Sequence, residues 1–294
     1  MGIDSAGVIF LSGAKWRGAD FSKNVTIGRQ AFFPEPDGLA RAFAASGISL
    51  DPQTFIPENP FSERFFTLLG AKEIVSIDYS SYERPTLTHD FNKPIPAEWR
   101  EMGSVVFDGG TIEHVFNVPQ AFKNCMELVK IGGYFLQLNV ANNYLGHGFW
   151  QFSPELLFRI FTPENGFQTE AVLLHEIEFT DVWYRVSDPA EVGWRVELHN
   201  CRPTYILTIA KRIATTEIFA NPPLQSDYVS LWSGRGKKSS AAGAVPQRVK
   251  SFVPGSLRRL LKPLLMDWSL MGLGWDKPYF KRLSADAVAN GRFS

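Results

Sequence analysis

The amino-acid sequence predicts an α/β fold with a doubly wound, mostly parallel sheet. Three observations lead to this prediction: short β-branched, apolar runs alternate with helical stretches of about ten residues, two of these runs end on an aspartate, and no internal repeat is evident. Right-handed crossovers in such a fold place ligands beyond the carboxyl ends of the strands. Residues that follow the predicted strands are therefore the first candidates for a functional site.

The N-terminal part of the chain opens with a predicted helix. Asp4 or Ser5 is a suitable cap, Val8 and Leu11 have helical spacing, and Gly18 ends the run. The elements expected here are, in order, a helix over residues 4–17, a strand over 24–28, helices over 37–45 and 61–69, and a strand over 73–78. The last strand is apolar and ends on Asp78, which is typical of a buried parallel strand.

The same alternation continues to residue 211. Ser153 is a suitable cap for a helix whose first position is Pro154, a residue that favours helix starts. The elements expected here are a strand over residues 104–108, a helix over 118–129, a strand over 132–140, a helix over 153–161 and strands over 167–175 and 204–211.

The composition changes after Ala220. Residues 228–266 contain eight Lys or Arg and no acidic residue, so the rest of the chain has 22 basic against 30 acidic residues, a formal charge of minus eight. We therefore predict a main domain over 1–220 and a basic, partly flexible C-terminal extension over 221–294 with a helix over 252–265. Three roles remain open for the extension: packing on the main domain, peripheral contact with anionic lipid, or contact with nucleic acid.

Length, charge and cysteine content exclude several classes of protein. A chain of 294 residues suits one large domain or one domain with an appendage, and 30 basic against 30 acidic residues argue against nucleic acid as a partner of the main domain. Cys125 and Cys201 are too few for a disulfide scaffold or a zinc knuckle, so the cytoplasm is the expected compartment. The early apolar run over 8–11 is too short for a signal peptide or a membrane span.

Candidate ligand-binding residues follow the first two predicted strands. Asp78 occupies the position from which a Rossmann-type fold accepts hydrogen bonds from ribose hydroxyls. The turn after the first strand holds Gly28 but no G-x-G-x-x-G motif, which disfavours an oxidoreductase that uses a dinucleotide. Arg29 in this turn could bind a ligand carboxylate or form an ordinary salt bridge.

The stretch from Val105 to Phe116 is the strongest candidate for a functional site. A glycine pair directly after a strand permits close approach of a ligand, and Glu113 and His114 place an acid and an imidazole on the same rim. The loop over 139–153 is rich in Asn, His and aromatic residues, and His147 lies there between two glycines. No tight metal-ligand spacing is present, so no metal is predicted.

Four segments in register resemble class I S-adenosylmethionine-dependent methyltransferases. Residues 70–78 resemble the second-strand segment of that family, and Thr111–Val115 resembles its "LEHV" motif. Residues 128–135 are similar to its "LKPGG" turn, with Ile131 in place of proline. Ser153–Leu157, followed by Gly166 and Phe167, is similar to the segment before its sixth strand.

This resemblance implies a seven-stranded sheet whose last strand, 204–211, is antiparallel, with S-adenosylmethionine lying across the strand ends. By analogy, Asp78 would hold the ribose, Asp90 would lie near the adenine, and the turns after the first and fourth strands would border the methionine part. The implied cofactor-binding residues are Gly28, Arg29, Gln30, Asp78, Tyr79, Asp90, Asp108, Gly109 and Gly110.

The expected activity is methyl transfer to an oxygen or nitrogen atom of a small molecule, such as a sugar or a secondary metabolite. His147 and His114 are the candidate catalytic bases, because imidazoles titrate near neutral pH. Glu113, Tyr144 and Trp150 are expected to line the acceptor site. The alternative is a methyltransferase-like scaffold that has lost catalysis and acts as a binding or assembly protein, suggested by the single glycine of the first turn.

Overall fold

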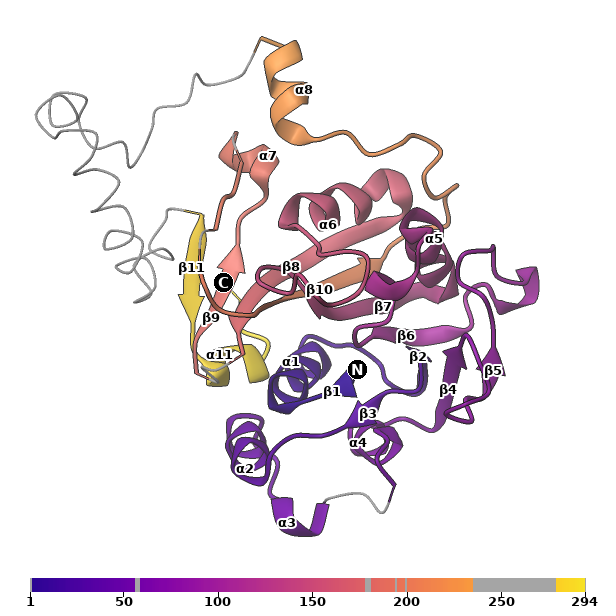
Figure 1. The fold of residues 1–294 in the computed structure, drawn as a ribbon, viewed down its shortest axis with the longest axis vertical. Coiled ribbons are helices and arrows are strands. Elements are labelled where there is room, and N and C mark those ends of the chain that lie inside the picture. The colour runs from indigo at the N-terminus through magenta and orange to yellow at the C-terminus, as the bar shows by residue number, and fades with distance from the viewer. Residues whose placement is uncertain are drawn as a thin grey trace, which may run out of the picture.

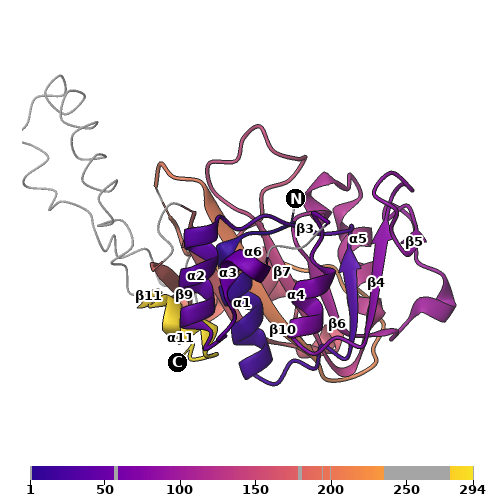
Figure 2. The ribbon, with the colours of Figure 1, turned by 90° about the horizontal axis from the view of Figure 1, so that it is seen from below.

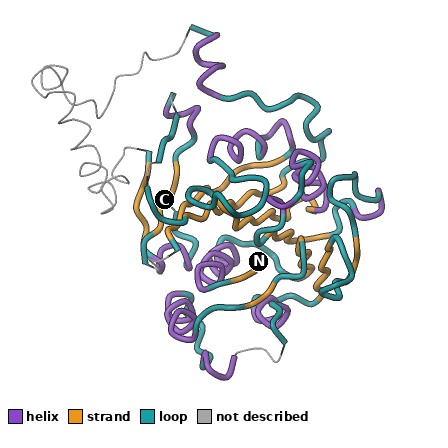
Figure 3. The backbone as a smooth tube through the Cα atoms, in the orientation of Figure 1, coloured by secondary structure: helices purple, strands orange, loops and turns teal. Residues whose placement is uncertain are grey.

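The computed structural model describes residues 2–55, 59–177, 181–193, 195–198, 200–234 and 279–293. These residues form an α/β fold in which one central sheet has helices on both faces (Figures 1 and 3). The strands of the main sheet are β2 (Lys23–Ile27), β4 (Glu73–Asp78), β5 (Leu87–Thr88), β6 (Gly103–Asp108), β7 (Val129–Val140), β8 (Phe167–Glu176), β9 (Trp183–Val186), β10 (Thr204–Arg212) and β11 (Phe280–Leu283). A separate pair consists of β1 (Gly2–Ile3) and β3 (Ala31–Phe32).

The main sheet has nine strands in the order β11-β9-β8-β10-β7-β6-β2-β4-β5. The five strands from β7 to β5 are parallel to one another. β10 is antiparallel to both β7 and β8, and β9 is antiparallel to β8 and β11. Seven of the nine strands therefore run in one direction, which confirms the predicted α/β fold with a mainly parallel sheet.

The predicted number of strands was wrong. The segment 204–211 does form the expected antiparallel strand, but it is not the last one, because β11 follows it in the chain. β9 and β11 extend the sheet beyond seven strands. Each has only four residues, and the pairing between Phe280 and Val186 joins segments far apart in the sequence, so local patterns gave no signal for either strand.

The helices cover the two faces of the sheet and bury a separate apolar cluster on each. α1, α2, α4 and α11 pack on one face together with Phe107 and Leu136, and Figure 2 shows the first three of these helices in front of the sheet. α5 and α6 pack on the other face with Val106 and Phe135. The helices are α1 (Ser5–Trp16), α2 (Pro36–Ala45), α3 (Pro52–Phe55), α4 (Glu63–Leu68), α5 (Val118–Leu128), α6 (Pro154–Ile160), α7 (Pro189–Val192), α8 (Ser226–Trp232) and α11 (Ala285–Ala289), with short 3₁₀ turns η1 (Ala97–Trp99), η2 (Ile112–His114) and η3 (Pro163–Asn165).

Local sequence explains where these helices start. The Asp4 side chain accepts a hydrogen bond of 2.8 Å from the Gly7 amide and so caps α1. Ser153 caps α6 in the same way, and Pro154 occupies the first helical position. Among the described helices, none combines the length and the apolar character that a bilayer span requires.

The last described residues join the same sheet and core as the N-terminal part. β11 pairs with β9, and α11 packs on α1 so closely that a Cβ atom on Gly13 would lie 2.0 Å from the Val288 carbonyl oxygen. Val288 and Ala289 belong to the apolar cluster under α1. Residues 280–289 of the predicted extension are thus part of the α/β unit, whereas the helix predicted over 252–265 lies outside the described residues.

Candidate functional site

The candidate site lies at the carboxyl ends of three adjacent parallel strands. β2 is flanked by β4 and β6, with Ile27 in register with both Ile77 and Asp108. The chain continues from β2 to β4 on one side and crosses to β6 on the other, which makes this the topological switch point where α/β folds bind ligands. The fold therefore brings the predicted residues after these strands to one edge.

The turn after β2 requires glycine at its first position. Gly28 has a φ angle of +76°, and a Cβ atom there would lie 2.7 Å from the Thr111 hydroxyl oxygen. That hydroxyl donates a hydrogen bond of 2.7 Å to the Ile27 carbonyl oxygen, which ties the turn after β6 to the end of β2. The turns after β2 and β6 are thus built against each other.

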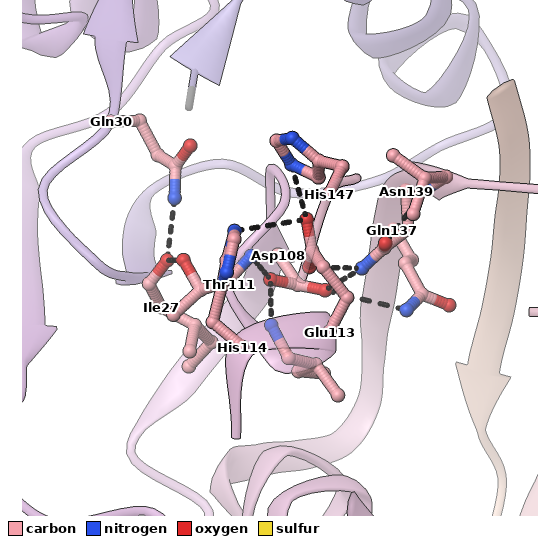
Figure 4. Close-up of polar contacts among 11 residues, drawn as sticks. Ile27, Gln30, Asp108, Thr111, Glu113, His114, Gln137, Asn139 and His147 are labelled. Carbon is pink, nitrogen blue, oxygen red and sulfur yellow. Dashed lines mark hydrogen bonds and ion pairs between the residues drawn. The ribbon is translucent and has the colours of Figure 1, made fainter. Parts of the chain in front are cut away.

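Gln30 folds back over the glycine pair that follows β6. Its amide nitrogen donates to the Ile27 carbonyl oxygen (Figure 4), and its oxygen would lie 2.3 Å from a Cβ atom placed on Gly109. The side chain is buried, and this oxygen has no hydrogen-bond partner within the described part of the chain. Gln30 therefore presents an unused acceptor next to Gly109.

Asp78 is partly buried and receives two backbone hydrogen bonds. Its Oδ2 accepts from the Arg29 amide at 3.2 Å, and its Oδ1 accepts from the Tyr79 amide at 2.7 Å. Each carboxylate oxygen can accept more than one hydrogen bond, so both have capacity for a ligand hydroxyl. The Tyr79 side chain itself is 75% exposed.

Arg29 and Asp90 make their main contacts with the protein. The Arg29 guanidinium lies 2.7 Å from the Glu63 carboxylate and 4.0 Å from the centre of the Phe61 ring. Of the two roles open for Arg29, the structure thus shows the salt bridge. Asp90 accepts two hydrogen bonds from Asn92, and these bonds lower the pKa of its carboxyl.

Asp108 is fully buried, and both of its oxygens are used inside the protein. Oδ1 accepts from the Thr111 and Ile112 amides at 2.8 and 3.3 Å. Oδ2 accepts from the side-chain amides of Gln137 and Asn139 at 3.3 and 3.0 Å. Burial raises the pKa of this carboxyl, although the hydrogen bonds oppose the shift. Asp108 has no exposed atom for the predicted ligand contact and instead holds the turn after β6 in place.

Glu113 is also fully buried and lies in η2, the 3₁₀ turn that follows β6. Its Oε2 accepts 2.9 Å from the Asn139 amide nitrogen, which also donates to Asp108. Its Oε1 has no hydrogen-bond partner among the described residues. Burial, followed by the negative charge of Asp108, raises the pKa of Glu113 to about 8.

Two histidines lie next to the free oxygen of Glu113. Figure 4 shows that His114 and His147 approach it from different segments, and their Nε2 atoms lie 3.7 and 3.5 Å from Oε1. The two rings are 5.0 Å apart between centroids, in edge-to-face orientation. Burial and then the positive charge of His147 lower the pKa of His114. The fold thus joins three predicted site residues that the sequence separates.

The loop after β7 brings His147 to this position. The Phe149 and Trp150 amides donate to the Glu113 carbonyl oxygen at 2.8 and 3.2 Å. Gly148, which directly precedes them, has a φ angle of +69°, and a Cβ atom there would lie 2.8 Å from the same oxygen. The Tyr144 ring packs edge-to-face on His147 at 5.7 Å, and the Trp150 indole donates to the Val115 carbonyl oxygen at 3.0 Å. Tyr144 therefore packs on His147, and Trp150 is held at the residue that follows His114.

The sequence analysis missed the amide side chains that organise the site. Gln137 and Asn139 alternate with apolar residues in β7 and point to the same face of the sheet. This polar alternation inside a buried strand is the signal that could have identified them. Thr111, which links the β2 and β6 turns, was also missed as a site residue.

Comparisons with known proteins found resemblance at the level of solved structures. No family model and no curated protein matches the chain. A putative methyltransferase from Bacillus halodurans C-125 is 12% identical, with a TM-score of 0.40, over 72% of this chain and 100% of the other. An S-adenosylmethionine-dependent methyltransferase from Thermotoga maritima, described as a possible histamine N-methyltransferase, is 15% identical over 71% and 92%, with a TM-score of 0.36. A putative S-adenosylmethionine-dependent methyltransferase from Listeria monocytogenes is 14% identical over 69% and 100%, with a TM-score of 0.35. Similarity at this level leaves the activity and the ligands of this chain open.

Proposed function

We propose that this protein transfers a methyl group from S-adenosylmethionine to an oxygen or nitrogen atom of a small molecule. The observation that carries the proposal is the partly exposed Asp78 carboxylate beside the Gly28 turn, at the switch point of the sheet. Two of the four sequence segments that resemble methyltransferases, residues 70–78 and Thr111–Val115, end at or follow strands of this same edge. The proposal thus depends on the site and the motifs of this chain.

The residues at the switch point fit the chemical groups of this cofactor. Both oxygens of Asp78 can accept from ribose hydroxyls while they keep their bonds to the Arg29 and Tyr79 amides. The unpartnered oxygen of Gln30 suits an ammonium group such as that of the methionine part. When bound, the cofactor supplies a methyl group that is activated by its positively charged sulfur.

The chain would contribute mainly by holding the acceptor in line with that methyl group. Tyr144 and Trp150 offer aromatic surface next to His147, and Trp150 is fixed by its hydrogen bond to Val115. His147 or His114 would remove the proton that the acceptor loses, since each side chain is partly exposed to solvent. A sugar or a secondary metabolite remains our proposed class of acceptor.

Calorimetric titration with S-adenosylhomocysteine tests the proposal. The wild-type protein should bind it, and Asp78→Ala should weaken binding at least about 100-fold, because two hydrogen bonds to a carboxylate are worth about 1.5 to 3 kcal/mol each. Asp20→Ala is the matched control, since in the described part of the chain Asp20 bonds with Ser22 and Lys130, which lie outside the site. Absence of binding at millimolar ligand would overturn the proposal, and an unchanged affinity in Asp78→Ala would move the ribose site elsewhere.

The acceptor can be sought with methyl-labelled cofactor. Incubation of the protein with a metabolite extract should transfer the label to one compound, and Asp78→Ala should not. Label found only in the cofactor and its breakdown products would argue against a small-molecule acceptor.

A second proposal concerns the basic stretch over 228–266, for which we keep peripheral contact with anionic lipid. α8, at the start of this stretch, exposes Leu231 and Trp232 by 51% and 72%. Apolar residues next to basic ones are typical of interfacial segments. Co-sedimentation with vesicles rich in phosphatidylserine should fall when Arg258, Arg259 and Lys262 are replaced by Gln. Equal partition of both proteins would rule out this contact.

A further inference from the structure

We infer that Glu113, His114 and His147 form a binding site for one divalent transition-metal ion, with Zn²⁺ as the probe of choice. This inference does not depend on methyl transfer. The three residues come from two segments, η2 and the loop after β7, that the fold brings together at the edge of the sheet (Figure 4).

The spacing of the three ligand atoms suits a metal ion. Oε1 of Glu113 lies 3.7 Å from Nε2 of His114 and 3.5 Å from Nε2 of His147. All three atoms lie within 4.8 Å of one another. Two ligands about 2.1 Å from a common ion lie about 3.0 Å apart at a right angle and about 3.4 Å apart at the tetrahedral angle. A contraction of a few tenths of an ångström would therefore bring Glu113 into coordination distance together with either histidine.

Glu113 provides the observation that points to a ligand. Its side chain is fully buried, yet Oε1 has no hydrogen-bond partner among the described residues and is directed at the two imidazoles. A buried carboxylate oxygen without a donor is costly, so such groups are normally paired or bound to metal. The two imidazole rings face this oxygen, and a cation bound between the three side chains would compensate it.

Asn139 orients the carboxylate from behind. Its amide nitrogen donates to Oε2 of Glu113 at 2.9 Å and to Asp108 at 3.0 Å, while its oxygen accepts from the Val140 amide at 2.7 Å. All polar atoms of this side chain are used, so its orientation is fixed. Support of a ligating carboxylate by an outer hydrogen-bond donor is a general property of metal sites.

The backbone also holds the histidines in place. Two amides of the His147 loop donate to the carbonyl oxygen of Glu113, so the loop is attached to the residue that carries the third ligand. The His114 amide donates to the Thr111 carbonyl oxygen at 3.0 Å within η2. The site is therefore assembled by the protein before any ion binds.

The ligand set defines the class of ion. Two imidazoles and one carboxylate on one side of an ion are typical of zinc, iron and manganese sites that keep further positions open. The side chains of His114 and His147 are 48% and 34% exposed, so water or a substrate atom could reach those positions. A metal ion would occupy Nε2 of each ring and leave Nδ1 as the N–H group, so a histidine that binds metal could not also act as the proton-accepting base.

Metal titration of the full chain tests the inference. After removal of metals with a chelator, Zn²⁺ should bind with a stoichiometry of one by calorimetry, and Co²⁺ should give the visible absorption of a four- or five-coordinate complex. Glu113→Gln and His147→Gln should each weaken Zn²⁺ binding at least about 100-fold, since outer partners alone are worth about 10- to 100-fold. Bound Zn²⁺ should also raise the melting temperature of the wild-type protein.

His89→Gln is the matched control, because His89 contacts Lys93, Phe91 and Trp99 instead of the three proposed ligands. It should keep the wild-type affinity. His147→Gln changes an exposed loop, so it remains informative even if Glu113→Gln fails to fold. Zn²⁺ binding that is absent, or equally strong in His147→Gln and wild type, would overturn the inference. Binding of S-adenosylhomocysteine is measured separately, so either proposal can fail alone.

Discussion

The two halves of the sheet each bury an ionisable side chain, Asp108 in one half and His175 in the other, with different hydrogen bonding. In the parallel half, from β7 to β5, Asp108 is fully buried but receives four hydrogen bonds from the β6 turn and from β7. In the antiparallel half, His175 of β8 is buried against Trp183, with ring centroids 4.2 Å apart, and bonds only to the Val182 carbonyl oxygen. Its Nε2 has no partner in the described part of the chain.

This difference separates two uses of burial. In the parallel half, Asp108 is buried with four hydrogen bonds that position the residues at the strand ends. In the antiparallel half, burial closes the core, and His175 is tolerated as a neutral ring. Changes in the first half should therefore affect both the site and the fold, and changes in the second half should affect the fold alone.

The largest effect is expected from Asp108→Ala. Removal of the carboxylate leaves four donors without their acceptor, two of them backbone amides, and should lower the free energy of unfolding by about 3 to 5 kcal/mol. Urea unfolding measures this change. Asp90→Ala is the control, because Asp90 is partly exposed, and it should change stability by less than about 1 kcal/mol. Equal effects of both substitutions would contradict the role of the Asp108 network.

A somewhat smaller effect is expected from acid in the antiparallel half. Burial lowers the pKa of His175 to about 4, below its ordinary value of 6.5. As the pH falls, His175 is protonated in the unfolded chain before it is protonated in the folded protein. The free energy of unfolding therefore decreases between about pH 6.5 and about pH 4, and His175 causes no further decrease below about pH 4. The total is about 3 kcal/mol.

His175→Asn isolates this contribution, because asparagine can still donate to Val182 but does not titrate. The difference in free energy of unfolding between wild type and variant, measured by urea at pH 7, 5.5 and 4, should shift by about 3 kcal/mol across the series. A difference that is constant with pH would show that the ring is not buried as a neutral group.

The smallest effect on stability is expected at the two glycines that flank His147, and it should differ between them. Gly148→Ala should cost about 1 kcal/mol of stability, because Gly148 has a left-handed φ angle and its Cβ would press on the Glu113 carbonyl oxygen. It should also weaken Zn²⁺ binding, since His147 would move. Gly146→Ala meets no atom within 4 Å and should leave both quantities unchanged. Indistinguishable variants would show that the loop does not position His147.

The sequence predicted the elements of the parallel half well and those of the antiparallel half less completely. Apolar runs such as 73–78 and 104–108 identified β4 and β6, because buried parallel strands carry strong local patterns. β9 and β11 escaped, since their pairing depends on contacts between distant segments. The β-propensity of a short segment does not show which distant segment it will pair with.

The site was predicted in the same uneven way. Glu113, His114 and His147 were each singled out, but their meeting around one carboxylate oxygen depends on how the loop after β7 folds. The prediction of no metal relied on sequence spacing, which cannot reveal a cluster in which His147 is 33 positions from His114 and 34 from Glu113. Asp108 was predicted to border the ligand, but its carboxylate is enclosed by Gln137 and Asn139. These two residues lie on another strand, so the local sequence around Asp108 does not reveal its burial.

The contact between α1 and α11 implies a delay during synthesis, because α1 can be covered only after α11 has been translated. Gly13 and Val288 touch, although 275 positions of sequence separate them. A ribosome that adds about 5 to 20 residues per second needs roughly 14 to 55 seconds to cover that distance. During that interval the surface of α1 that α11 will cover stays exposed to chaperones and to other nascent chains. This apolar surface is buried only after α11 has been synthesised.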